Sequence, residues 1–390
     1  MIEIFKNNRL VDNSYVRQQL SDRTLKKHGD YWLYSFHAVP MLNDLRSRSL
    51  PFSTPWLNDR HPDYMQLPKF EYSSKSLNDI LDERAIELHR RAVQDNKQIW
   101  IMWSGGIDST TMLTAFIKNV PANELDRYAI IMSANSIAEN YYFYKTFIHN
   151  KFRTINWLDL DLNQELLSET IVLHGDPANA LLSCPTVSVF APLVESGNHL
   201  LPFRDNISTI IDTLEAFVIK SRGTVKPGWA EWYINKLADA IPKYDQATSI
   251  ATFWWWNYVN FKWHGSILRP FFFTRSSTNE PISEQEFRYY YDTCFYINDD
   301  LQNWSYSNID RIVQSPFDYK PMMRDYIYEL THDELYQKYK GFKASRRTNL
   351  NQAQQVADDM PLVYDGNWIG HAKSDKLLDT MTQLLNEYQG

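Results

Sequence analysis

The segment from Ser104 to Thr110 combines residue types that suit the binding of a phosphate group. Gly105 and Gly106 carry no side chain, so they allow the backbone to approach a ligand closely. Asp108 offers a carboxylate that can hold a magnesium ion already shared with phosphates. Hydroxyl groups that can donate to phosphate oxygens are supplied by Ser104, Ser109 and Thr110. Together these residues predict a phosphate-binding turn.

The predicted turn lies between a strand and a helix. Gln98–Trp103 is a short apolar run typical of a buried strand, and Ser109–Asn119 has the apolar spacing of a helix. A turn in this position points backbone N–H groups at one spot, and the helix dipole adds positive potential there. The spacing is shorter than in the GxxxxGK[ST] loop, and the lysine of that loop is missing. The alternative is an ordinary strand–turn–helix connection in which a Ser or Asp caps the helix.

The turn resembles the pyrophosphate-binding signature of the PP-loop ATP pyrophosphatase superfamily. Six residues carry this resemblance: Ser104-Gly105-Gly106-Ile107-Asp108-Ser109. These enzymes split ATP between its α and β phosphates and activate a carbonyl or carboxylate as an adenylate. They include asparagine synthetase, β-lactam synthetase, NAD synthetase, GMP synthetase, tRNA-lysidine synthetase and 7-cyano-7-deazaguanine synthase. The resemblance implies that this segment and Thr110 bind ATP, with Asp108 on Mg²⁺ and in catalysis.

Three later stretches resemble the asparagine-synthetase branch of the superfamily. Leu173–Leu181 (LHGDPANAL) is similar to its GEGxDEL segment, and Ser315–Asp318 (SPFD) is similar to its PFLD element. Lys343–Arg347 matches the lysine and arginine of its KxxxR segment. The alternative for this last stretch is a solvated basic surface. By the resemblance, four residues would complete the site: Lys343 on the α-phosphate and the developing charge, Arg347 and Gly175 on the nucleotide, and Asp176 on the metal and in catalysis.

This chain departs from that branch at two points. The aspartate and glutamate of the strand-end loop fall on Asn179 and Ala180, which leaves Asp176 as the only carboxylate of that loop. Full asparagine synthetases also begin with a catalytic cysteine on a glutaminase domain, whereas this sequence begins Met1-Ile2 and has a shorter segment ahead of the turn. The resemblance therefore predicts no built-in glutaminase, with ammonia coming from solution or from a separate subunit.

A further nucleotide contact is predicted at the end of the second strand. Ser133 begins the segment Ser133–Ser136, at the place where the superfamily holds adenine and ribose with backbone groups and small side chains. Helix capping by Ser136 is an equally good explanation of part of this segment, because Ser136 to Glu139 matches a capping box.

Strands and helices alternate regularly in the first half of the chain. The predicted strands are Gln98–Trp103, Tyr128–Ser133, Thr154–Leu160 and Thr170–Leu173. The predicted helices are Ser76–Asn96, Ser109–Asn119, Ala138–Asn150 and Asn163–Glu169. This alternation predicts an α/β fold with a parallel twisted sheet and helices on both faces, and the resemblance implies the PP-loop, HUP-like version of it. Ligands of such sheets bind beyond the carboxyl ends of the strands.

We predict three regions in the chain. Residues 1–75 form an irregular N-terminal module, 76–205 a nucleotide-binding α/β domain, and 206–390 a mainly helical region that completes the active site. The last region is rich in aromatic runs, namely Phe253–Trp256, Phe271–Phe273 and Tyr289–Tyr291. These runs are typical of core and interface filling, with base or sugar stacking as the alternative.

Composition disfavours several other classes of protein. The net charge of −7 and the pI near 5.8 disfavour a nucleic-acid partner. Two cysteines, Cys184 and Cys294, cannot build a four-cysteine zinc site, and we interpret both as small buried hydrophobes. We interpret His174 as a hydrogen-bonded structural histidine. No apolar run approaches the roughly 18 residues of a membrane span, so we expect a cytoplasmic protein without a membrane partner.

The leading hypothesis is an ATP-dependent, magnesium-requiring ligase. It would adenylate the carboxylate or carbonyl of a small molecule or peptide, release pyrophosphate, and form an amide with ammonia or an external amine. One alternative is a nucleobase- or tRNA-modifying enzyme of the deazaguanine or lysidine type, although two cysteines cannot supply the zinc site of deazaguanine synthases. The other is a catalytically reduced nucleotide-binding scaffold, which Asn179 and Ala180 motivate.

Overall fold

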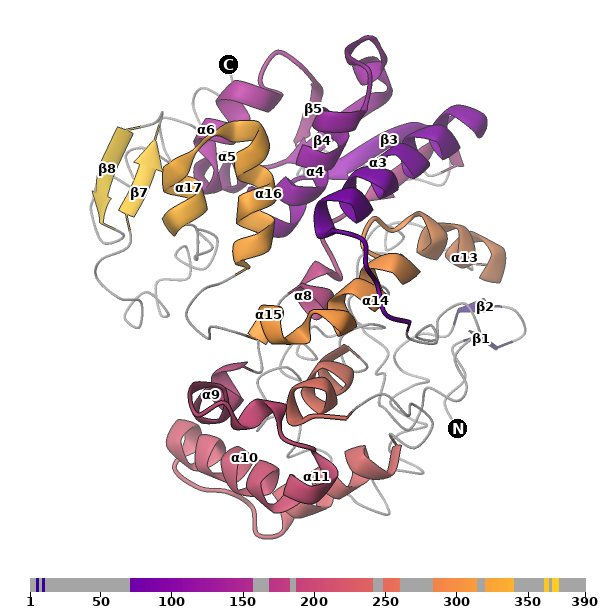
Figure 1. Cartoon of the computed structure of the whole chain (residues 1–390). Coiled ribbons are helices and arrows are strands. Elements are labelled where there is room, and N and C mark those ends of the chain that lie inside the picture. The colour runs from indigo at the N-terminus through magenta and orange to yellow at the C-terminus, as the bar shows by residue number, and fades with distance from the viewer. Residues whose placement is uncertain are drawn as a thin grey trace. The chain divides into compact units, whose positions relative to one another are not determined.

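A computed structural model describes ten ranges of the chain, which form two compact units (Figure 1). The described residues are 5–6, 9–10, 71–156, 168–182, 187–240, 248–259, 283–313, 320–339, 361–364 and 367–371. The sheet unit is the described part of Ser76–Gly175, Thr293–Phe295 and Asp318–Gly390. The helical unit is the described part of Met1–Lys75, Asp176–Asp292 and Tyr296–Phe317.

The sheet unit is built on four parallel strands in the order β5-β4-β3-β6. Their bounds are Gln98–Met102 for β3, Tyr128–Met132 for β4, Arg153–Asn156 for β5 and Thr170–Leu173 for β6. All four predicted strands are present, and residues 157–160 of the third prediction lie outside the described ranges. The parallel sheet with its intervening helices confirms the predicted α/β fold.

Both faces of β3 are buried, as its uninterrupted apolar sequence predicts. Ile99 and Ile101 alternate with Trp100 and Met102 along the strand, so the two pairs point to opposite faces. Ile99 and Ile101 are fully buried. Trp100 belongs to a core cluster that also contains Ala129, Ile131 and Val172. The helix predicted at Asn163–Glu169 falls outside the described residues except for its last two positions, so helices on both faces stay a prediction.

Two helices pack on β3 and on each other: α3, which spans Leu77–Gln94, and α4, which spans Ile107–Asn119. Ser76 caps α3, because its hydroxyl accepts a hydrogen bond from the backbone N–H of Asp79 at 3.1 Å. The buried side of α3 repeats at three- and four-residue spacing: Leu77, Ile80, Leu81, Ala85, Leu88 and Ala92. Both helix predictions are confirmed, and α4 begins two residues before the predicted start.

The helix predicted at Ala138–Asn150 is wrong in its start and its continuity. The segment is instead divided into α5 at Ala134–Glu139, α6 at Tyr141–Phe143 and a π-helical turn η6 at Tyr144–Ile148. Ser133 rather than Ser136 is the cap of α5, because the hydroxyls of Ser133 and Ser136 each accept the backbone N–H of the other residue. The break between α5 and α6 falls at Asn140, whose side chain caps α6.

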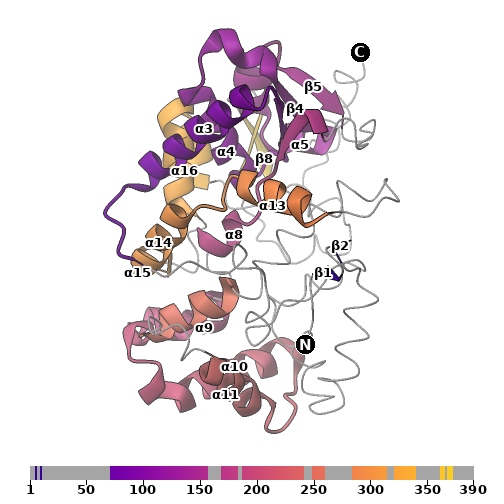
Figure 2. The ribbon, with the colours of Figure 1, turned by 90° about the vertical axis from the view of Figure 1, so that its right-hand side faces the viewer.

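The sheet unit continues with short elements after β3 and near the C-terminal end. They are η5 at Ala122–Arg127, α16 at Pro321–Thr331, α17 at Glu334–Tyr339, and the antiparallel strands β7 at Pro361–Tyr364 and β8 at Asn367–His371. Figures 1 and 2 show α16 beside α4, and the two helices are in contact.

The helical unit consists mostly of short to medium helices. They are α8 at Ala178–Leu181, α9 at Val187–Glu195, α10 at Ile207–Arg222, α11 at Trp229–Ala240, a helix at 250–259, α13 at Glu284–Thr293, α14 at Asp299–Ser307 and α15 at Ile309–Val313. The turns η8 at Asn198–Leu200 and η9 at Arg204–Asn206 and the strands β1 at Phe5–Lys6 and β2 at Arg9–Leu10 complete it. No helix in the described ranges is long and apolar enough to cross a membrane.

The aromatic run from Phe253 to Trp256 forms core, as the sequence predicts. All four side chains are at most 3% exposed. Trp255 donates its indole N–H to the hydroxyl of Ser305 at 2.7 Å, and Trp254 stacks on Phe190 with ring centroids 4.0 Å apart. Base stacking is therefore excluded for this run, because its rings are already covered. The run Phe271–Phe273 lies outside the described residues.

Candidate functional site

The predicted phosphate-binding turn connects the end of β3 to the start of α4. β3 has β4 on one side and β6 on the other, and all three strands are parallel. The chain moves from β3 outward through β4 to β5 and then returns to the far side of β3 with β6. The strand order therefore reverses between β3 and β6, and open parallel sheets bind ligands at the carboxyl ends of strands at such a point.

Gly105 gives the turn a shape that requires glycine. Its backbone is left-handed, with φ at 73°, a conformation that other residues rarely adopt. A Cβ at this position would overlap the backbone carbonyl oxygen of Ser136 and would lie 2.7 Å from the Cβ of Glu139. Because both neighbours belong to α5, the turn is packed directly against the helix that follows β4.

The two serines of the turn close it through their hydroxyl groups. The hydroxyls of Ser104 and Ser109 are 3.1 Å apart and within hydrogen-bond distance. Ser109 Oγ also accepts the backbone N–H of Ser104 at 3.0 Å and donates to the carbonyl of Gly106 at 3.2 Å. These bonds fix the backbone of the turn, so its N–H groups are held in position before any ligand binds.

The helix that begins at the turn offers donors to an anion. Gly106 is the N-cap of α4, and within the described part of the chain no side chain caps this helix. The N–H groups of a first helical turn have no acceptor inside the helix, and the dipole of this 13-residue helix adds positive potential at the same end. The start of α4 can therefore bind a phosphate.

The loop after β6 approaches the turn closely at Gly175. A Cβ on Gly175 would lie 3.1 Å from the Cβ of Asp108 and 3.1 Å from the backbone nitrogen of Ser109. The preceding residue, His174, is buried, and its Nε2 lies 3.7 Å from the thiol of the buried Cys294. These positions agree with the interpretation of His174 as structural and confirm that of Cys294 as buried. Cys184 lies outside the described residues.

Lys320 is a residue of the site that sequence reasoning missed. Its ammonium nitrogen forms an ion pair with Oδ1 of Asp108, the acid of the predicted turn. The side chain of Lys320 is 1% exposed and that of Asp108 is 14% exposed. The two residues are 212 positions apart, so no local pattern pairs them. The only signal is that Lys320 follows closely on Ser315–Asp318, the stretch that resembles the PFLD element.

Tyr336 is a second residue that the sequence did not indicate. It lies on α17, and its hydroxyl is buried. Burial raises the pKa of Tyr336, the nearby Thr110 hydroxyl opposes this, and the carboxylates of Glu139 and Asp108 raise the pKa further. The hydroxyl therefore stays protonated and uncharged next to the helix that begins at the turn.

The other predicted site residues are distributed as follows. Ser133 caps α5 at the carboxyl end of β4, one strand away from β3. Asp176 follows Gly175 and belongs to the helical unit. The predicted basic contacts, Lys343 and Arg347, lie outside the described residues, as does Ser315–Asp318.

The predicted turn offers one carboxylate, that of Asp108, to a magnesium ion. Across the ranges that the structure describes, no three residues of the His, Cys, Asp or Glu type form a metal-binding group. Magnesium usually takes one or two protein carboxylates and completes its shell with water and substrate phosphates. Asp108, at the start of α4, fits this requirement as a single carboxylate beside the predicted phosphate-binding turn.

A hydrogen bond between Trp103 and Thr110 joins the end of β3 to α4, and its removal should be measurable. The indole N–H of Trp103 donates to the Thr110 hydroxyl at 3.1 Å, and both side chains are buried. Thr110→Val keeps the shape but leaves the indole N–H without this acceptor, so we expect a loss of about 1–3 kcal/mol in the free energy of unfolding.

Thr114→Val is the matched control for Thr110→Val. Thr114 is also fully buried on α4, and its hydroxyl has no partner among the described residues, so its replacement should be neutral or stabilising. Urea unfolding curves of the two variants give the comparison. Equal losses of unfolding free energy in Thr110→Val and Thr114→Val would contradict a stabilising role for the hydrogen bond from Trp103.

Comparison with known proteins adds no relative: the chain matches no protein-family model, no curated protein and no solved structure.

Proposed function

We propose that this chain is an ATP pyrophosphatase of the PP-loop type, and within that class a magnesium-requiring amide ligase. It adenylates the carboxylate or carbonyl of a small molecule or peptide, releases pyrophosphate, and joins the activated group to ammonia or an external amine. One observation supports the assignment to the PP-loop type most strongly. The segment Ser104–Ser109, which resembles the pyrophosphate-binding signature, lies at the carboxyl end of the central strand where the strand order reverses.

In this proposal the residues of the turn bind and orient the phosphates. The N–H groups at the start of α4 donate to phosphate oxygens, and Gly105 lets the backbone approach them. Asp108 would hold magnesium, which when bound supplies positive charge to the phosphates. Donors that are fixed before the reaction stabilise the charge that develops on the pyrophosphate leaving group without rearrangement. Lys343 and Asp176 remain the proposed partners of this turn at the α-phosphate and the metal.

A nucleotide-binding protein without turnover is the second candidate. The observation that favours it is the ion pair of Asp108 with Lys320, because the carboxylate proposed for the metal already has a cationic partner. Asn179 and Ala180, where the resemblance would place two acids, point in the same direction.

The test is an assay for the products of adenylation. Purified protein is mixed with α-labelled ATP, magnesium, ammonia and a panel of small carboxylates and peptides, and AMP and pyrophosphate are quantified. The ligase proposal predicts equal amounts of both products, dependent on one of the acceptors. Thr114→Val serves as an active control, and Asp108→Asn should lower the rate by at least two orders of magnitude.

Each outcome of this assay separates the candidates. Tight ATP binding without AMP formation would favour the nucleotide-binding protein over the ligase. Absence of ATP binding would contradict both. A mass increase on added RNA, with AMP release, would favour the base-modifying alternative, which the acidic net charge of −7 disfavours.

A further inference from the structure

We infer that α16 and α17 form an autoinhibitory lid that closes on the start of α4 and opens as one body. The inference rests on the proposed function, because it concerns Asp108, the acid proposed for magnesium. In the closed position Lys320, the N-cap of α16, forms a buried ion pair with Asp108. Tyr336 of α17 lies near Thr110 in the first turn of α4. Magnesium at the same carboxylate would be repelled by the ammonium charge, so the lid has to open before the metal binds.

The two helices of the lid are tied to each other and belong to the sheet unit together with α3 and α4. Arg324 of α16 donates hydrogen bonds to the backbone carbonyls of Gln337 and Lys338 on α17. The side-chain amide of Gln337 in turn donates to the carboxylate of Asp325 on α16 at 2.8 Å. Because these hydrogen bonds join the two helices, a movement of α16 carries α17 with it.

The charges of α16 oppose the dipole of that helix and complement the charges of α4. α4 has Asp108 in its first turn and Lys118 in its last turn, which is the arrangement that a helix dipole favours. α16 has the reverse arrangement, with Lys320 at its N-cap and Glu329 in its last turn. Lys320 pairs with Asp108, and Glu329 pairs with Lys118 at 3.0 Å. The charges of α16 therefore stabilise its docking on α4 and disfavour the undocked helix, which with 11 residues is marginal in water.

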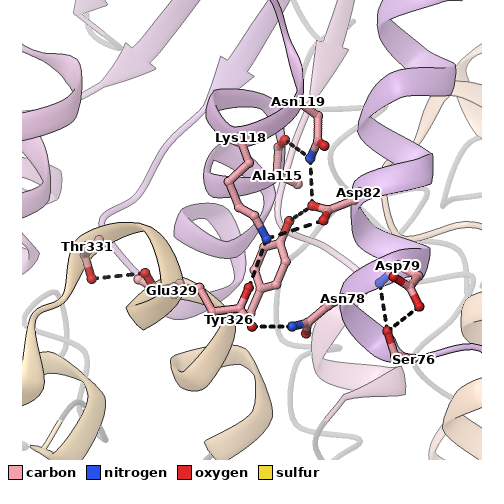
Figure 3. A network of polar contacts seen from close by, with 11 residues as sticks. Ser76, Asn78, Asp79, Asp82, Ala115, Lys118, Asn119, Tyr326, Glu329 and Thr331 are labelled. Carbon is pink, nitrogen blue, oxygen red and sulfur yellow. Dashed lines mark hydrogen bonds and ion pairs between the residues drawn. The ribbon is translucent and has the colours of Figure 1, made fainter.

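The latch of the lid is the polar network around Lys118, at the other end of α4 (Figure 3). The ammonium nitrogen lies 3.0 Å from an oxygen of Glu329 on α16, 3.4 Å from one of Asp82 on α3, and 4.1 Å from the centre of the Tyr326 ring. Tyr326 donates its hydroxyl to Asp82, and the side chain of Asn78 donates to Glu329. The side chains of Lys118 and Glu329 are 22% and 48% exposed, so salt weakens the latch by screening.

The closed lid is the resting state, because α16 also buries the apolar side chains of Met323, Tyr326 and Ile327. Opening would expose them, so the open state is a minor population, as in other local openings of folded proteins. A ligand that binds only the open state has an apparent Kd equal to its intrinsic Kd divided by the open fraction. A weaker latch should therefore increase the open fraction and tighten the binding of ATP with magnesium by the same factor.

The test combines hydrogen exchange and calorimetry on the full chain. In the wild type, peptides from α16 and α17 should exchange faster than those from β3 and β4. Their exchange should also depend less on urea, because lid opening exposes less surface than global unfolding. ATP with magnesium should speed exchange of the lid peptides and slow that of the β3 and β4 peptides, since the ligand binds the open lid but not the unfolded chain.

Lys118→Met weakens the latch without touching the start of α4. It should speed exchange of the lid peptides about 5- to 30-fold, the effect of losing an ion-pair network and a cation–π contact. Binding of ATP with magnesium should tighten by the same factor. A high concentration of KCl should speed lid exchange more in the wild type than in Lys118→Met. Lys145→Met is the matched control and should change neither quantity, because Lys145 is exposed and forms no ion pair within the described ranges.

The outcomes separate this inference from the proposed function. Lid peptides that exchange at the rate of the β3 and β4 peptides, or more slowly once ATP and magnesium are added, would overturn the inference. Faster lid exchange in Lys118→Met with the ATP affinity of the wild type would also overturn it, and in each case the proposed function would stand. If lid exchange follows the expectation but neither the wild type nor Lys118→Met binds ATP, the opening of the lid stands and the proposed function is overturned.

Discussion

Replacement of Gly105 by alanine is expected to abolish ATP binding and to lower the free energy of unfolding of the sheet unit by about 2–5 kcal/mol. Two independent effects add at this position. A left-handed backbone costs a residue with a Cβ roughly 1–2 kcal/mol. The Cβ would also overlap the carbonyl oxygen of Ser136, and relief of an overlap inside a packed structure costs about 1–3 kcal/mol.

The effect on binding follows from the location of the overlap. Ser136 is a backbone partner at the start of α5, so it cannot move aside as the end of a flexible side chain could. The turn must move instead, and with it the N–H groups at the start of α4. A displacement of about 1 Å at a binding site can cost two orders of magnitude in function, so ATP binding is lost even in molecules that fold.

Gly223→Ala is a matched control for Gly105→Ala. Gly223 has the same left-handed backbone, with φ at 82°, but a Cβ there meets no atom within 4 Å. Gly223→Ala should therefore lower the free energy of unfolding only by the cost of the left-handed backbone, roughly 1–2 kcal/mol, and should leave ATP binding unchanged. Because the chain has two units, hydrogen exchange of β3 and β4 peptides measures the sheet unit, and exchange of α10 peptides measures the helical unit, which contains Gly223. If Gly105→Ala binds ATP like the wild type, the turn is not the nucleotide site.

The sequence predicted the four strands of the parallel sheet and the helices α3 and α4 because each of these elements is local. The strand Gln98–Trp103 and the helix Ser76–Asn96 depend on periodic apolar residues and a neighbouring cap, and both signals lie within a few residues. The helix after β4 was misjudged because two serines three positions apart both suit a cap. Only the packing of Ser136 against Gly105 and the cap at Asn140 distinguish the observed arrangement.

Sequence reasoning named the contiguous turn of the candidate site and, through the resemblance, Gly175 after β6, which packs against Asp108. The turn from Ser104 to Ser109 is visible as a string of residue types, and its hydroxyl bonds span at most five positions. Lys320 and Tyr336 reach the site from α16 and α17 across more than 200 residues. Their approach depends on how those helices pack on α4, which no local pattern encodes.

Asp108→Asn is expected to destabilise the sheet unit by about 3–5 kcal/mol, the usual loss when one partner of a buried ion pair is removed. The side chain of Lys320 is 1% exposed, so its ammonium group cannot recover the lost partner by hydration. Lys320→Met should cost less, because the carboxylate of Asp108 is 14% exposed and can reach water. We therefore expect Asp108→Asn to lose more stability than Lys320→Met. If Asp108 served only the ligand, its replacement would leave the stability of the free protein unchanged.

The double variant Asp108→Asn/Lys320→Met makes this prediction a thermodynamic cycle. Replacement of a whole buried pair by neutral groups of similar volume is often close to neutral, so the double variant should recover most of the stability that Asp108→Asn loses. Hydrogen exchange of β3 and β4 peptides should then give a coupling energy of about 2–3 kcal/mol. If the stability losses of the two single variants simply add in the double variant, the ion pair between Asp108 and Lys320 does not stabilise the protein. A loss of AMP and pyrophosphate formation in Asp108→Asn therefore counts as evidence for metal binding only after comparison with the double variant, since removal of the Asp108 carboxylate also breaks the buried ion pair with Lys320.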